Sequence, residues 1–186
     1  MQDDVSGAAI PSIVVVKFAT NKDGSKMRTY KREKDIDRVV KYVCKDKGSG
    51  KISLDYVGGN GVSVTDYKKA IRDIKRFQKK MGKETGRRLY HLIISFAYEK
   101  NPQIVYEVVE RICDSFFFNY QYIFNVHTDS RNLHAHICIG SVGIRAPHKK
   151  IHFSKKEGAA LLGEIKDLAM ELLNPDFRLG YYDGFC

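Results

Sequence analysis

The sequence predicts an α+β domain in which helices pack on a sheet, and three observations lead to that prediction. Apolar runs typical of strands alternate along the chain with amphipathic stretches typical of helices. A hairpin pattern occupies residues 120–142, where two strand-like runs flank a polar turn. The chain has 186 residues, 43% of them hydrophobic, which is enough for one domain with a substantial core. We therefore expect a single domain over residues 1–186, with 1–9 as a flexible lead-in.

The N-terminal part predicts a strand, a basic loop and a helix. The apolar run at residues 10–19 predicts a strand in a central position of the sheet. The helix after the loop is indicated by four apolar residues with the i, i+3, i+4, i+7 spacing, Ile36, Val39, Val40 and Val43. Gly48 and Gly50 are expected to end it. At 100° per residue Tyr42 lies roughly 110° from the centre of the apolar stripe, at the flank of the buried face.

The next segment predicts a turn and a strongly basic helix. Short strand-like pieces at 52–57 and 62–64 flank the sequence GGNG, whose glycines permit a tight turn. Thr65 is the expected N-cap of a helix over residues 66–81.

Three further elements complete the pattern. The run at 88–97 predicts a strand on which Leu89, His91, Ile93 and Ser95 share one face. Pro102 opens an amphipathic helix that leads into the hairpin. Residues 143–153 are expected to form an irregular turn and a strand, and Ser154 to cap a final helix over 155–173.

Three histidines meet in the hairpin. His127 ends the first run about where His134 begins the second, and His134 and His136 share a face. Cross-strand Cβ atoms lie roughly 4.5–5.5 Å apart, so three imidazoles can reach one ion. Asp129, in the turn, is placed either to fix the tautomer of a ligand histidine or to serve as an ordinary turn residue. Spacing alone leaves open whether these are metal ligands or surface histidines.

The charge is concentrated in the first half of the chain. Residues 17–51 carry 12 Lys and Arg against 5 Asp and Glu, residues 65–89 carry 10 against 3, and residues 90–186 carry 10 against 11. This imbalance favours a polyanionic partner over a merely solvated lysine-rich surface. The candidate nucleic-acid contacts are Lys68, Arg72, Lys75, Arg76, Arg87 and Arg88.

Several classes of protein are disfavoured. No apolar run approaches the roughly 20 residues of a membrane span, and the acidic N-terminus with its short apolar run is not a secretory signal. The 4 cysteines show no CxxC spacing, which argues against both a zinc ribbon and a disulfide framework. We expect a cytoplasmic protein.

The ordered motifs resemble those of a known family. HTDSRNLHAH resembles the third motif, H-x-D-x-x-N-x-H-x-H, of the conjugative relaxases of the P mobilisation family, within the HUH endonuclease superfamily. VVKYVCKDKGSGK resembles the first motif, which implies Tyr42 as the nucleophile, with Tyr30 in the preceding loop as the alternative. His91, Ser95 and Phe96 resemble the second motif, whose serine helps to hold the DNA at the nick. The resemblance covers roughly residues 10–175.

The resemblance implies a largely antiparallel five-stranded sheet and a complete reaction. Tyr42 would nick a specific strand of single-stranded DNA through a 5′-phosphotyrosine and later rejoin it, with Asp129 orienting a ligand histidine. The divalent ion held by the histidines would be Mg²⁺ or Mn²⁺ by resemblance, whereas three imidazoles by softness favour Zn²⁺ or another transition metal. Implied partners are single-stranded DNA at a transfer origin, relaxosome accessory proteins and a type IV secretion coupling protein.

Two other classes of function remain open. A rolling-circle replication initiator or a single-tyrosine transposase would use the same histidine pair, but its tyrosine usually follows the histidines. A non-catalytic, metal-stabilised nucleic-acid-binding module would explain the basic half of the chain, and it should unfold on chelation. The chain leaves no room for a helicase or primase domain, and is either a minimal relaxase or a fragment of a longer one.

Overall fold

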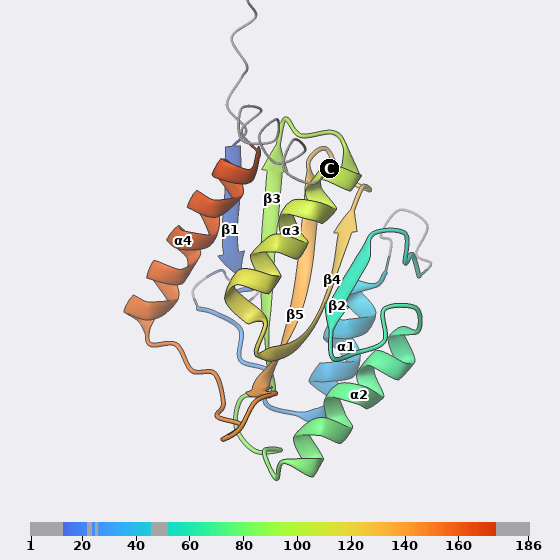
Figure 1. Cartoon of the computed structure of the whole chain (residues 1–186), viewed down its shortest axis with the longest axis vertical. Coiled ribbons are helices and arrows are strands. Elements are labelled where there is room, and N and C mark those ends of the chain that lie inside the picture. Colours follow the sequence, from blue (N-terminus) through green and yellow to red (C-terminus); the bar gives the residue numbers. More distant parts are fainter. Residues whose placement is uncertain (1–12, 22–23, 25, 46–51, 174–186) are drawn as a thin grey trace, which may run out of the picture.

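The computed structural model of the protein describes residues 13–21, 24, 26–45 and 52–173. These residues form a five-stranded sheet in which every neighbouring pair of strands is antiparallel (Figure 1). Its spatial order is β1 (Ile13–Phe18), β3 (Leu89–Ala97), β5 (Leu133–Gly143), β4 (Tyr120–His127) and β2 (Val57–Asn60). The predicted α+β class and antiparallel sheet are confirmed.

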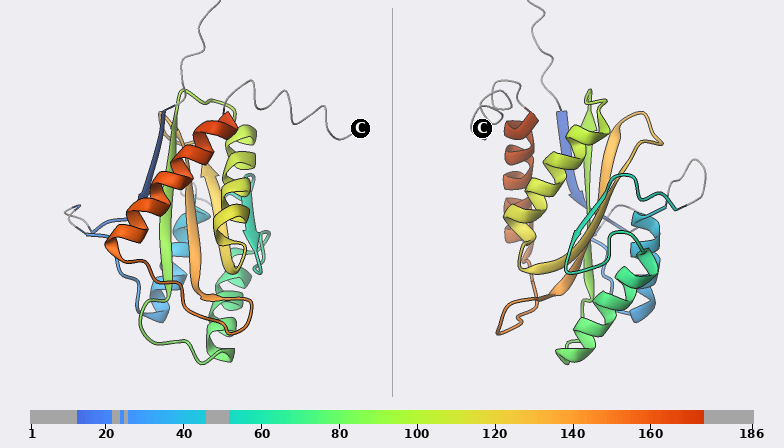
Figure 2. Two further views of the ribbon diagram at one scale, coloured as in Figure 1. Left: turned by 60° about the vertical axis from the view of Figure 1, so that its left-hand side comes forward. Right: turned by 45° about the vertical axis from the view of Figure 1, so that its right-hand side comes forward.

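Two helices cover each face of the sheet. Figure 2 shows α3 (Pro102–Phe117) and α4 (Lys155–Leu173) on one face, and α1 (Glu33–Val43) and α2 (Tyr67–Lys80) on the other. Alternation along the strands divides the core accordingly. The α3/α4 side buries the even-numbered residues of β3, Tyr90, Leu92, Ile94 and Phe96. The α1/α2 side buries Leu89, Ile123 and Cys138.

The first strand lies at an edge of the sheet, so its expected central position is wrong. Val14 and Phe18 are buried in the core beside α4. Ile13 and Val15 point to the other face and are 52% and 51% exposed. A continuous apolar run predicts cover on both faces, but α4 covers only one face here.

The GGNG sequence belongs largely to a strand, which corrects its expected role as a turn. Gly58 and Gly59 lie in β2, antiparallel to β4. A Cβ at Gly58 would collide with the ring of Phe124, and one at Gly59 would lie 2.7 Å from the carbonyl oxygen of Tyr122. The two glycines therefore allow close approach between strands, and Gly61, with φ 67°, supplies the turn.

Helix boundaries differ from the predictions by a few residues. α1 ends at Val43 with Cys44 as its C-cap, and the expected stops at Gly48 and Gly50 lie outside the described residues. Asp66 rather than Thr65 caps α2, because its carboxylate accepts hydrogen bonds from the backbone N–H groups of the first helical turn.

The segment after β5 is irregular. Within residues 143–153 the expected strand is replaced by a single bridge between Val142 and Lys150. Ser154 accepts a hydrogen bond from the N–H of Glu157 and caps α4 as predicted. Of the helices in the described ranges, none combines the length and the apolar character needed to cross a membrane.

Candidate active site

The three hairpin histidines form one cluster on the face of the sheet that carries α1. His127 pairs with His134 across β4 and β5, and Asn125 pairs with His136. The three ring centroids lie 4.8–5.2 Å apart. One nitrogen of each ring lies within 4.8 Å of the others, a spacing that suits a shared ion. The hairpin geometry predicted from the sequence is therefore present.

Carbonyl groups fix the tautomers of two of these histidines. His127 Nε2 lies 2.7 Å from the carbonyl oxygen of Val43, the last residue of α1, and His134 Nδ1 lies 3.2 Å from that of Asn132. A carbonyl oxygen only accepts, so both ring nitrogens carry the proton and donate. The lone pairs then sit on His127 Nδ1 and His134 Nε2. Among the described residues, no hydrogen-bond partner reaches the buried His127 Nδ1. The residues present fit a bound metal ion.

His91 contacts His136, and this contact was not predicted. Its Nε2 lies 3.0 Å from His136 Nδ1, and its Nδ1 lies 3.4 Å from the hydroxyl of Tyr30. This contact holds the ring of His136, as partners of metal ligands commonly do. The sequence placed His91 on the same face as Ser95, but the contact depends on β3 lying beside β5, which the local pattern does not reveal.

Tyr42 lies against the histidine cluster. Its ring centroid is 4.9 Å from that of His136 and 5.8 Å from that of His91, in edge-to-face geometry. The side chain remains 37% exposed, so a substrate can reach it. Tyr30, the alternative nucleophile, is only 2% exposed, and burial raises the pKa of its hydroxyl. The structure thus brings together the tyrosine helix and the three histidines.

Ser95 and Asp129 border the same cluster. Ser95 is half-buried on β3 and is the cross-strand partner of His134. Asp129 follows β4 in the hairpin turn and lines a cavity of about 60 Å³ together with His127. His134 Nδ1 lies 3.0 Å from the hydroxyl of Ser130, in addition to its contact with the Asn132 carbonyl. Ser130 is thus a second hydrogen-bond partner of His134, and the sequence did not single it out.

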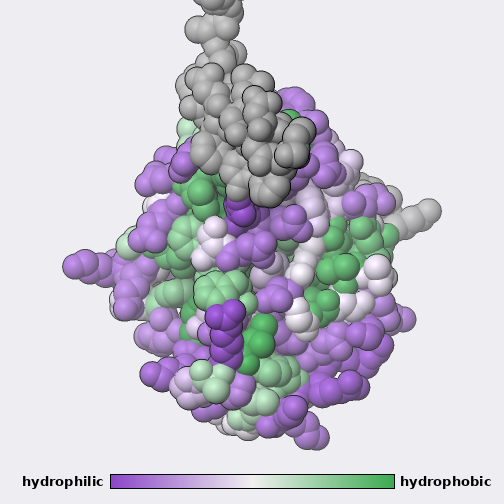
Figure 3. Space-filling view, viewed as in Figure 1, coloured by the Kyte–Doolittle hydropathy of each residue, from purple (hydrophilic) through white to green (hydrophobic). Residues whose placement is uncertain are grey.

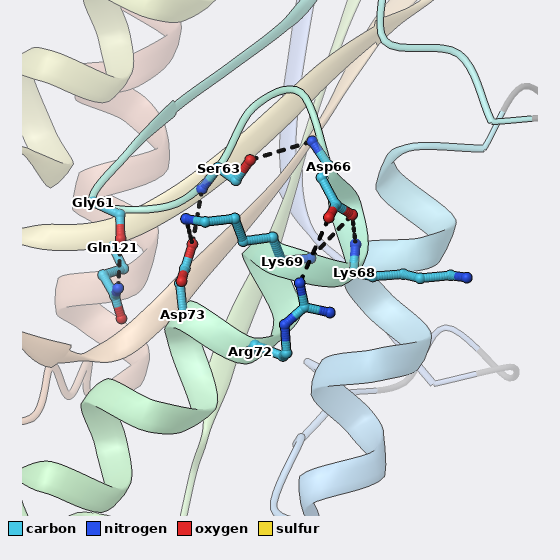
Figure 4. A network of polar contacts seen from close by, with 8 residues as sticks. All are labelled: Gly61, Ser63, Asp66, Lys68, Lys69, Arg72, Asp73 and Gln121. Carbon is cyan, nitrogen blue, oxygen red and sulfur yellow. Dashed lines mark hydrogen bonds and ion pairs between the residues drawn. The ribbon is translucent and has the colours of Figure 1, made fainter.

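The predicted basic contacts differ in what they can reach. Lys68, Arg72 and Arg76 are exposed on α2, and hydrophilic side chains cover that part of the surface (Figure 3). Arg72 forms an ion pair with Asp66 at 3.6 Å. Figure 4 shows these two side chains beside each other, with the side chain of Lys68 extending away from the network. α2 therefore presents cations to solvent near its N-terminus.

Three of the predicted contacts are engaged within the protein. Lys75 Nζ forms ion pairs with Asp37 at 2.8 Å and Glu33 at 3.1 Å, joining α2 to α1. The guanidinium of Arg87 stacks over the ring of Tyr90 at 4.4 Å. Arg88 is only 5% exposed and donates to Gln78 and to the carbonyl of Glu84. Its expected role in binding DNA is corrected, since its charge is turned inward.

Comparison with known proteins identifies the family. A family model described as "Relaxase: MobA/VirD2-like, nuclease domain" matches residues 42–171, well over half of the chain. The chain belongs to the MobA/VirD2-like relaxase family. The matched stretch begins at Tyr42 and includes all three histidines. In general terms this relaxase domain is a DNA-nicking enzyme of conjugative transfer, and single-stranded DNA at a transfer origin is its partner.

A solved structure supports the fold of this relaxase domain. It is described as "Molecular Basis of Vancomycin Resistance Transfer in Staphylococcus aureus" and is similar with a TM-score of 0.54 and 14% identity, over 95% of each chain. At this identity the likeness concerns the fold alone. No curated protein matches the chain.

Proposed function

We propose that this relaxase domain nicks and rejoins one specific strand at a transfer origin through a 5′-phosphotyrosine on Tyr42. One observation carries the proposal: Tyr42 is the half-exposed tyrosine whose ring lies 4.9 Å from His136, within a histidine cluster that can hold a metal. A nucleophile beside a metal site is an arrangement that suits phosphoryl transfer, because the metal can polarise the phosphate that the nucleophile attacks.

The reaction exchanges one phosphoester for another. The phenolic oxygen of Tyr42 forms a bond to the scissile phosphorus as the bond from phosphorus to the 3′ oxygen breaks. The phenolic proton is balanced by the proton that the released 3′ hydroxyl gains. A divalent ion on His127, His134 and His136 would act as a Lewis acid on the phosphate. Because no phosphoester bond is lost overall, the step is reversible and permits rejoining after transfer.

The neighbouring residues are proposed to have supporting roles. Ser95, opposite His134 on the adjoining strand, is positioned to donate a hydrogen bond to the DNA backbone near the nick. Asp129, beside His127 in the turn, is proposed to orient a ligand histidine when the metal is bound. Mg²⁺ or Mn²⁺ follows from the family, whereas three imidazole ligands favour Zn²⁺ or another transition metal.

The exposed cations of α2 are proposed to bind the DNA backbone. Lys68, Arg72 and Arg76 face solvent on the same side of the sheet as Tyr42. Lys75 and Arg87 contribute positive charge nearby, although both are already engaged within the protein. Such contacts supply affinity that falls with salt rather than sequence recognition.

We place the reaction in the cytoplasm, with relaxosome accessory proteins and a type IV secretion coupling protein as further partners. Within the described residues Cys44, Cys113 and Cys138 are free and buried, as is typical of a reducing compartment. Burial raises the pKa of the Cys44 thiol to about 12, so it stays protonated and unreactive.

The test is a covalent adduct. Wild-type protein with Mn²⁺ and single-stranded transfer-origin oligonucleotides is expected to form a protein–DNA adduct that maps to Tyr42. Tyr42→Phe should abolish the adduct while metal binding and non-covalent DNA binding persist, because it removes one oxygen at an exposed edge. Tyr30→Phe leaves the phenol of Tyr42 in place and should still form the adduct, which separates the two candidate nucleophiles.

Each other outcome has a definite meaning. An adduct on Tyr30 would move the nucleophile to the loop before α1. Labelling of no tyrosine by any single-stranded substrate, together with unfolding on chelation, would favour the metal-stabilised binding module.

A further inference from the structure

A second cavity lies next to the proposed nucleophile, apart from the histidine cluster. Its volume is about 350 Å³, within the roughly 300–1,000 Å³ usual for small-ligand pockets. Tyr42 and His91 line it, so it shares a wall with the active site. The other lining residues come from β1, the following loop, α1 and β3, and are Lys17, Ala19, Thr20, Arg28, Tyr30, Arg38, Val39 and Ile93.

The cavity is cationic. Lys17, Arg28 and Arg38 line it, and among the residues that the structure describes no carboxylate does. Arg38 is partly neutralised, because it forms an ion pair with Asp35 at 3.0 Å. Lys17 has no ion pair within the described part of the chain. Arg28 lies 5.6 Å from the centroid of the Tyr30 ring. Lys17 and Arg28 therefore face the cavity without an ion pair to any carboxylate in the described ranges.

The remaining wall is aromatic and aliphatic. Ile93, half-buried on β3, provides apolar surface beside the cations, whereas Tyr30 and Val39 are 2% and 3% exposed and line the cavity only with their edges. Burial raises the pKa of Tyr30, while the positive charges of Arg28 and Arg38 oppose that rise, which is a sign of a positive potential at this wall. A cationic end and an apolar side together match the two parts of a nucleotide, its phosphate and its base.

We propose that this cavity binds one nucleotide of the substrate strand next to the scissile phosphate, with its phosphate on Lys17 and Arg28 and its base against Ile93. The proposal rests on the proposed function, because continuity with Tyr42 is what identifies the ligand as DNA. One nucleotide held here would fix the position of the scissile bond relative to the phenol, and so contribute to nick-site selection.

The first experiment measures non-covalent binding in a Tyr42→Phe background, so that no adduct forms. Fluorescein-labelled dT12 is titrated by anisotropy at several salt concentrations. For a single strand, removing the protein's hold on one phosphate lowers the slope of log K against log salt by about 0.7. Lys17→Met and Arg28→Gln should each lower the slope by part of that amount, because the other cation still contacts the phosphate. The double variant should lower it by the full amount of about 0.7, because both cations bind one phosphate.

The matched control is Lys166→Met, which removes an exposed lysine from α4 on the opposite face and should leave the slope unchanged. Unchanged slopes for Lys17→Met and Arg28→Gln would overturn the proposal. A double variant that lowers the slope by about 1.4, the amount for two phosphates, would place the cations on separate phosphates and would refute a site for one nucleotide.

The second experiment tests for the base. In the Tyr42→Phe background, dTMP should displace dT12 at lower concentration than inorganic phosphate does, and Lys17→Met should weaken displacement by both ligands. Equal displacement by the two ligands would reduce the cavity to an anion site and refute the base contact. Neither experiment requires nicking, so failure of the Tyr42 adduct assay remains distinguishable from failure of this proposal.

Discussion

Replacing His91 tests whether its contact with His136 strengthens metal binding. His91→Ala removes the interaction of 3.0 Å between His91 Nε2 and His136 Nδ1, and the ligand ring can then rotate. Removal of such a partner commonly weakens metal binding 10- to 100-fold, which corresponds to about 1.4–2.7 kcal/mol. His91→Gln should recover part of that affinity, because a glutamine side chain places a polar atom near the position of Nε2. His91→Asn is too short to do so.

The assay is the dissociation constant for Mn²⁺, measured by calorimetry without DNA. Tyr30→Phe removes the interaction of 3.4 Å between the Tyr30 hydroxyl and His91 Nδ1, and should weaken metal binding less than His91→Ala does. The double variant His134→Ala/His136→Ala is the negative control. It should bind no metal at this site and should remain folded by circular dichroism. A folded His91→Ala protein with the wild-type dissociation constant would refute the reasoning, as would weakening of metal binding to the same extent in all three His91 variants.

Two further predictions concern DNA affinity and the stability of α1. Changing Arg72 and Arg76 to glutamine should lower the slope of log K against log salt for single-strand binding by about 0.7 for each phosphate no longer bound. An unchanged slope in the same anisotropy assay would mean that these side chains are merely solvated. Asp35→Asn should lower the free energy of unfolding by about 1–2 kcal/mol at pH 7, because the carboxylate accepts hydrogen bonds from the N–H groups of Lys31 and Arg32 before α1. Burial acts to raise the pKa of Asp35, but these hydrogen bonds and the nearby arginines hold the pKa below its usual 3.8. The stability that the carboxylate contributes is therefore fully present above pH 3.8, and it is lost as the pH falls through the pKa of the folded state. Urea denaturation at pH 7 and at pH 3 measures the difference in free energy of unfolding between the wild type and Asp35→Asn, and an equal difference at the two pH values would contradict this account.

Local patterns in the sequence predict the elements of this fold well. The helix of α1 follows from its periodicity, because its apolar stripe is covered on a single face, and the hairpin of β4 and β5 follows from two strand-like runs that flank a polar turn. The same patterns do not specify the order of strands. Residues 10–19 read as a central strand, yet Ile13 and Val15 are exposed at an edge. Whether an apolar side chain is covered depends on where a distant helix packs, which its own neighbours in sequence do not encode.

The candidate site divides in the same way. The spacing of His127, His134 and His136 within one hairpin is local, so their convergence could be predicted. The contact between His91 and His136 requires β3 to lie beside β5, and the cavity beside Tyr42 requires four segments to meet. Arg88 shows the converse, since its charge suggested a DNA contact until its burial against α2 became visible.

The last turn of α1 positions two parts of the candidate site, so a change in its position affects both. It carries Tyr42, and one residue later the carbonyl of Val43 holds the proton-bearing nitrogen of His127. A shift of this helix by one residue would displace the nucleophile and release a ligand ring in the same movement. Substitutions that loosen the end of α1 should therefore impair metal affinity and adduct formation in proportion. A new nucleophile engineered elsewhere on the scaffold would leave the metal site intact but would lose this mechanical linkage.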